Sequence, residues 1–176
     1  MTVNFVSRRA AATDIVSLIF YPEQLFQREE PEVLKAIGVR NTILHHEFGL
    51  DNRSMVAWSY KNWTIEGIPD QILEDIVVEG KVVSPNSNIN ILAASAWIQG
   101  FIYAKALGLE KYKIILFNKN LETIVERTFS VRAEEQKILF FIDRAIGVLE
   151  AIRALNDSGK RAHNLITQNS LLEVRE

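Results

Sequence analysis

The chain contains no cysteine, which excludes disulfide bonds, thiolate metal sites, iron–sulfur clusters and cysteine nucleophiles. Its N-terminus lacks a signal-peptide pattern. One charge-free stretch, 82–104, has an apolar part, 91–104, that includes Ser95 and Gln99 and is too short to cross a bilayer. We therefore expect a cytoplasmic protein without a membrane partner.

A large net charge is also missing, since the formal charge is −2 over 176 residues. Proteins that coat nucleic acid are usually strongly basic, so a coating role is disfavoured. An enzyme that grips DNA locally remains compatible, because the carboxylates of its site offset the surrounding lysines and arginines. No repeat, low-complexity tract or linker divides the chain, and we expect one domain over 1–176, with a core of about 13–155 and a tail of about 156–176.

Hydrophobic periodicity and breaker residues divide the chain into helices and strands. We expect helices over 13–21, 23–29, 31–48, 91–107 and 133–155, and strands over 54–60, 63–68, 75–83, 111–118 and 122–131. Thr13 and Asp14 are expected to cap the first helix, and Asn88 or Asn90 the fourth. This order predicts an α/β fold in which helices flank one mixed β-sheet, with strands 75–83 and 111–118 parallel around a crossover helix.

Three fragments of this pattern carry residue types suited to cutting phosphodiesters. Asp70 supplies a carboxylate where the strand 63–68 ends. Glu79 and Lys81 are two residues apart, which places both on one face of a strand. Gln99 and Tyr103 are four residues apart, on one face of a helix. Two carboxylates can hold a divalent ion and a lysine beside them can orient or deprotonate a water, so these fragments predict a metal-dependent nuclease site.

A pair of adjacent histidines, His45 and His46, lies near the end of the expected helix 31–48. Neighbouring residues on a helix point about 100° apart, so at most one of the two faces a common site. Either histidine is a candidate metal contact, and the sequence leaves the choice open.

The order strand–Pro–Asp, strand–Glu–x–Lys and a Gln-x-x-x-Tyr helix resembles the PD-(D/E)xK nuclease superfamily. More narrowly, it resembles the RecB-like exonucleases, including the CRISPR-associated RecB-like family, in which an early histidine and a Gly-x-x-Asp complete the pattern. The matching residues are His45 or His46, Gly67 with Asp70, Glu79 with Lys81, and Gln99 with Tyr103. The chain departs from the CRISPR-associated relatives in lacking the cysteines of an iron–sulfur cluster.

The resemblance implies a restriction-endonuclease-like core and a deoxyribonuclease, in particular an exonuclease, that depends on Mg²⁺ or Mn²⁺. Asp70, Glu79, the main-chain oxygen of Gly80 and one histidine would bind the ion, and Lys81 would complete the catalytic group with the two carboxylates. Gln99 and Tyr103 would hold the nucleic acid. DNA is the expected partner, its strandedness open, and a homo-oligomer or partner proteins of a repair or defence system are compatible with the pattern.

Each motif also has a structural interpretation. Asp70 could cap the turn after its strand, and Glu79 could pair with Lys81 on an edge strand. Tyr103 could belong to the core. Two alternatives to the nuclease are therefore a catalytically inactive nuclease-fold subunit for DNA binding or assembly, and an unrelated α/β interaction module. Within the nuclease interpretation, the motifs leave open DNA or RNA and exo- or endonucleolytic cleavage.

Overall fold

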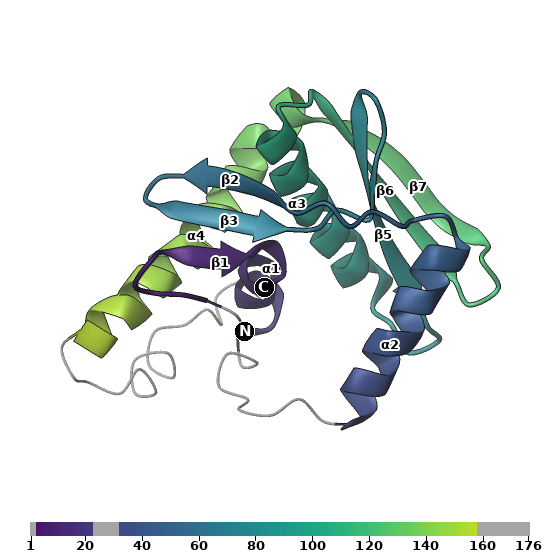
Figure 1. Ribbon diagram of the computed structural model, residues 1–176, viewed down its shortest axis with the longest axis horizontal. Helices are drawn as coiled ribbons and strands as arrows, with labels where there is room; N and C mark the ends of the chain where they lie inside the picture. Colours follow the sequence, from purple (N-terminus) through teal and green to yellow (C-terminus); the bar gives the residue numbers. More distant parts are fainter. Residues whose placement is uncertain (1–2, 23–31, 158–176) are drawn as a thin grey trace.

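The computed structural model describes residues 3–22 and 32–157, and within them the chain forms seven strands and four helices (Figure 1). In chain order they are β1 (Arg9–Ala11), α1 (Ala12–Phe20), α2 (Glu32–Glu47), β2 (Val56–Tyr60), β3 (Trp63–Gly67), β4 (Gln71–Ile72), β5 (Ile76–Val83), α3 (Ile89–Leu107), β6 (Lys111–Asn118), β7 (Thr123–Ser130) and α4 (Val131–Asp157). The expected helix 23–29 and the tail after residue 157 lie outside the described residues. In the described part of the chain, no helix is both long and apolar enough to cross a membrane.

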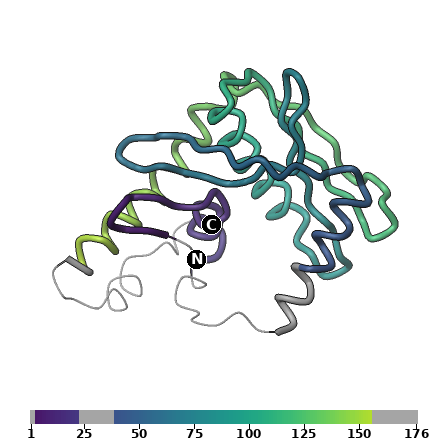
Figure 2. Tube along the Cα trace, viewed as in Figure 1, coloured from purple at the N-terminus to yellow at the C-terminus, as the bar shows by residue number. Residues whose placement is uncertain are grey.

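The expected fold class is confirmed, since helices flank mixed sheets, but there are two sheets instead of one. The first has the strand order β1-β3-β2 and the second β4-β5-β6-β7. Between them the chain passes through Ile68, Pro69 and Asp70, and proline cannot donate a ladder hydrogen bond, which interrupts the pairing there. Figure 2 shows the β2–β3 hairpin extending away from the four-stranded sheet. The sequence did not indicate β1 and β4, because three and two residues are too short to show a periodicity.

The crossover unit at the centre of the fold follows the prediction. β5 and β6 pair in parallel, with Glu79 beside Ile114, and α3 connects them. Asn88, not Asn90, caps α3, because its side-chain oxygen accepts hydrogen bonds from the backbone N–H groups of Asn90 (3.1 Å) and Ile91 (3.3 Å). Gly108 ends the helix in the left-handed conformation, with φ of 70°.

The capping of α1 differs from the prediction. The helix begins at Ala12, and Asp14 lies within its first turn instead of before it. There its carboxylate accepts a hydrogen bond from the backbone N–H of Ala11, at 3.3 Å. The acidic group still satisfies a free N–H at the helix start, but from inside the helix.

Packing on both faces of β5 positions the candidate site. The main core joins α3 to both sheets and to α1 and α4, and includes Ile15, Ile65, Phe101, Ile102, Tyr112, Leu116, Ile138 and Leu149. A smaller cluster, formed by Leu44, Leu50, Val78 and Phe117, packs the end of α2 against the other side of β5. The middle of β5 is thus covered by helices on both sides.

Candidate functional site

The Glu79–Gly80–Lys81 segment of β5 alternates between the two covered faces. The carboxylate of Glu79 and the amine of Lys81 meet on the α3 side, with Lys81 Nζ 2.6 Å from Glu79 Oε1. Gly80 faces the α2 side, where a Cβ would collide with the side chain of Leu50. A glycine between two charged residues therefore lets α2 and its following loop pack closely on the strand.

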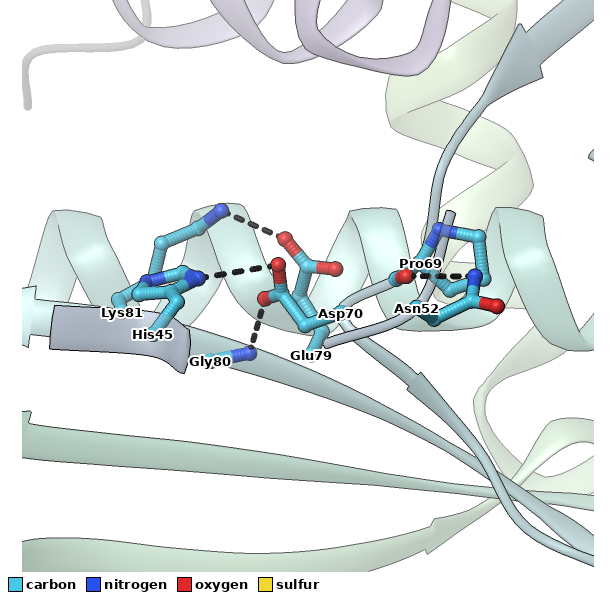
Figure 3. A network of polar contacts seen from close by, with 7 residues as sticks. All are labelled: His45, Asn52, Pro69, Asp70, Glu79, Gly80 and Lys81. Atoms are coloured by element: carbon cyan, nitrogen blue, oxygen red, sulfur yellow. Dashed lines mark hydrogen bonds and ion pairs between the residues drawn. The ribbon is translucent and has the colours of Figure 1, made fainter. Parts of the chain in front are cut away.

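Asp70 reaches this segment from the loop after β3 (Figure 3). Its Oδ2 accepts a hydrogen bond from the backbone N–H of Gly80 at 2.7 Å, and its Oδ1 lies 3.0 Å from His45 Nδ1. Asn52 holds the loop, because its side-chain amide donates to the carbonyl of Pro69 and its backbone N–H to that of Asp70, both at 2.9 Å. His45 of α2 and Gly80 of β5 thus contact the carboxylate of Asp70, and Asn52 holds the main chain of its loop.

Glu79 is a buried ionisable group of the site. Its side chain is buried, with the residue 3% exposed, and its Oε2 has no hydrogen-bond partner among the described residues. Burial raises the pKa of Glu79 to about 7, and the carboxylate of Asp70 adds to the rise, while Lys81 and His45 oppose it. A second cation beside Glu79 would therefore favour its ionised form.

Gln99 and Tyr103 of α3 lie behind the carboxylates and are both buried. The Gln99 side chain hydrogen-bonds the Tyr103 hydroxyl. Burial, and then the nearby carboxylates of Glu79 and Asp70, raise the pKa of Tyr103 far above its usual range, so the hydroxyl stays protonated. A Cβ at Gly67 would come within 2.7 Å of that hydroxyl. The sequence predicts that Gln99 and Tyr103 hold the nucleic acid, and this role stays a prediction. In the structure both side chains are buried, and Tyr103 lies against Gly67.

The structure separates the two adjacent histidines. His45 faces Asp70, whereas the exposed ring of His46 lies 3.2 Å from Asp51. The turn of about 100° between neighbouring helical residues produces this difference. Of the two candidate metal contacts, His45 lies against the carboxylate of Asp70, and His46 lies against that of Asp51.

Sequence reasoning did not identify Asn52 or Leu50 as parts of the site. Asn52 lies in the loop between α2 and β2, and Leu50 packs against Gly80. Neither residue forms a motif with its sequence neighbours, because each acts through a contact with a distant segment. No local signal in the sequence indicates them.

Within the described residues, no three His, Cys, Asp or Glu side chains lie together in an arrangement that could hold a metal ion. The carboxylates of Asp70 and Glu79 instead face separate partners, the N–H of Gly80 and the amine of Lys81. Their chemistry nevertheless fits a hard divalent cation, because both are oxygen donors and Glu79 Oε2 is buried without a partner. Asp70 contacts His45, and the carboxylate of Glu79 lies near both groups.

Comparison with known proteins identifies no family: no protein-family model and no curated protein matches the chain. Similarity to solved structures is at a low level, as two of them illustrate. The crystal structure of SSO0001 aligns with a TM-score of 0.48 and 17% identity, covering 80% of this chain and 76% of that one. An alkaline exonuclease (LHK-Exo) from Laribacter hongkongensis aligns with a TM-score of 0.48 and 11% identity, covering 88% of this chain and 95% of that one. Similarity at this level does not assign the chain to a family.

Proposed function

We propose that the protein is a metal-dependent nuclease that hydrolyses phosphodiester bonds of DNA. The observation that carries this proposal is the buried Glu79 carboxylate, which has one oxygen paired with Lys81, one oxygen without a partner, and Asp70 beside it. An incompletely paired buried carboxylate costs stability, and such costs are concentrated at functional sites.

The ion would be Mg²⁺ or Mn²⁺, bound by Asp70, Glu79, His45 and the main-chain oxygen of Gly80. In an extended strand the N–H and C=O of one residue point to the same side. Since the N–H of Gly80 binds Asp70, its carbonyl faces the same edge of β5. When bound, the ion would polarise the scissile phosphate, help to activate a water and stabilise the leaving oxygen.

The other site residues position the reacting groups. Glu79 holds the amine of Lys81 at 2.6 Å, so that Lys81 can orient the attacking water or stabilise the charge that develops on the phosphate. Tyr103 interacts with the side chain of Gln99 and packs against Gly67. Its contact with Gly67 supports the loop that carries Asp70.

The resemblance to RecB-like nucleases extends the proposal to an exonuclease formed by one domain over 1–176. In that case it would act in the cytoplasm, as a homo-oligomer or with partner proteins of a repair or defence system. The inactive nuclease-fold subunit is the alternative, because the Glu79–Lys81 ion pair would also stabilise a protein without activity.

The test is digestion of end-labelled linear and circular DNA, single- and double-stranded, with Mg²⁺, Mn²⁺ or a chelator. Lys81→Ala should abolish cleavage, because it removes the amine that would orient the attacking water or stabilise the charge on the phosphate. Lys105→Ala is the matched control, because it breaks an ion pair of similar length, 2.8 Å to Glu135, elsewhere in the fold. Sparing of circular DNA would indicate an exonuclease. A folded wild type that cleaves none of these substrates, and that Mn²⁺ does not stabilise, would refute the proposal in favour of the inactive subunit.

A further inference from the structure

A cavity of about 580 Å³ adjoins the candidate site between the last turns of α2, the end of β5 and the turn that joins β6 to β7. Leu44, which precedes His45, and Val82, which follows Lys81, both line it. Val83, also in the lining, is two residues beyond Lys81, about 7 Å along an extended strand. The cavity lies on the α2 side of β5, the side of Gly80, whereas the amine of Lys81 lies on the α3 side. His45 and Asp70, which meet beside Gly80, are therefore the site residues that the cavity adjoins.

The charge of the cavity is positive, although the formal charge of the protein is −2. Arg40 and Lys119 line it, and the lining includes no aspartate or glutamate. Neither cation forms an ion pair with another described residue. By contrast, Arg53, beside the His45 end of α2, lies 3.6 Å from Asp51. Within the part of the chain that the structure describes, the two positive charges of the cavity have no acidic partner, and such a pair favours a polyanion.

The turn that carries Lys119 is held in place by its own asparagine. The side-chain oxygen of Asn118 accepts hydrogen bonds from the backbone N–H groups of Asn120 at 2.8 Å and Glu122 at 3.1 Å. Its amide donates to the carboxylate of Glu122 at 2.7 Å, which is the acidic group nearest in sequence to Lys119. Lys119 is therefore presented from a fixed turn.

The lining of the cavity also includes apolar side chains, among them Leu44, Val82 and Ile124, and Ile124 is 45% exposed. A lining that combines cations with apolar side chains matches the two kinds of surface of a nucleic acid strand. Phosphates contact arginine and lysine, while sugars and base faces contact apolar side chains. A small anion would use only the two cations.

We propose that this cavity holds the DNA strand adjacent to the scissile phosphate, with Arg40 and Lys119 contacting its phosphates. The inference rests on the proposed nuclease function, because that function places the scissile phosphate at the ion that Asp70 and His45 would hold, on the side of β5 that carries the cavity. It adds a binding segment that the catalytic motifs do not include.

The test compares two double variants that each remove two positive charges. Arg40→Ala with Lys119→Ala removes the cations of the cavity. Lys111→Ala with Arg132→Ala is the matched control, because both cations lie at the far end of β6 from Asn118. Lys111 begins that strand. Arg132 follows Val131, whose N–H donates to the carbonyl of Glu110 at 2.8 Å. All four side chains are exposed, so both variants should fold, which thermal unfolding checks.

Binding of a fluorescent single-stranded 20-nucleotide DNA is measured by anisotropy in a chelator, over a range of salt concentrations. For two lost phosphate contacts, the slope of log K against log salt should fall by about 1.4, and Kd at 0.15 M salt should rise about tenfold. The control variant should match the wild type. Equal effects of both variants, no effect of either, or no binding by the wild type would overturn the inference.

A cleavage assay with Mn²⁺ separates this inference from the proposed function. If the wild type cleaves, the cavity variant should raise KM with kcat within about twofold, because its side chains bind the strand away from the reacting atoms. If the wild type binds DNA but does not cleave it, the nuclease proposal fails, and the binding comparison still decides the role of the cavity.

Discussion

Replacement of Glu79 by glutamine should remove a pH-dependent loss of stability. The pKa of Glu79 rises from 4.5 to about 7 in the folded protein because the carboxyl group is buried. Between these two values the unfolded chain has released the proton that the folded protein retains. Stability therefore falls as the pH rises through this window, and levels off above the folded pKa.

The size of the effect follows from the shift. A difference of about 2.5 pKa units, at about 1.4 kcal/mol per unit, corresponds to about 3.5 kcal/mol of unfolding free energy over the whole titration. Glutamine has nearly the same shape as the protonated acid but cannot ionise. The advantage of Glu79→Gln over the wild type should therefore be about 3 kcal/mol larger at pH 8 than at pH 4.5.

Urea unfolding of both proteins at several pH values, without divalent metal, measures this difference. Glu135→Gln is the control, because Glu135 forms the half-exposed ion pair with Lys105, and its effect should stay within about 1 kcal/mol across the range. Addition of Mn²⁺ at pH 8 should stabilise the wild type and leave Glu79→Gln almost unchanged. A difference between wild type and Glu79→Gln that is constant with pH would refute the reasoning.

Two further predictions concern the neighbours of Glu79. Gly67→Ala should destabilise the protein by about 1–3 kcal/mol, because the new Cβ would come within 2.7 Å of the Tyr103 hydroxyl. Gly147→Ala should instead stabilise it by about 0.5–1 kcal/mol, because the new Cβ meets nothing within 4 Å and lies inside α4. Thermal unfolding compares the two variants. His45→Ala should weaken Mn²⁺ binding, measured by calorimetry, by about tenfold or more, while His46→Ala should not; equal losses would contradict the assignment of His45 to the site.

Local patterns in the sequence predicted most of the helices and strands. The two-residue spacing of Glu79 and Lys81 and the four-residue spacing of Gln99 and Tyr103 predicted side chains on common faces, and both pairs are in contact. The parallel pairing of β5 and β6 followed from the long helix between them. These features depend on the direction of side chains relative to their own element, which periodicity alone determines.

Only the tertiary structure decided which of these elements meet. It chose His45 over His46, placed the carboxylate of Asp70 on the N–H of Gly80, and brought Asn52 to the loop of Pro69. It also divided the expected sheet in two and buried Gln99 and Tyr103 against the protein. Each of these outcomes depends on the packing of segments that are distant in the chain. The residues next to a given position in the sequence do not determine which distant segment packs against it.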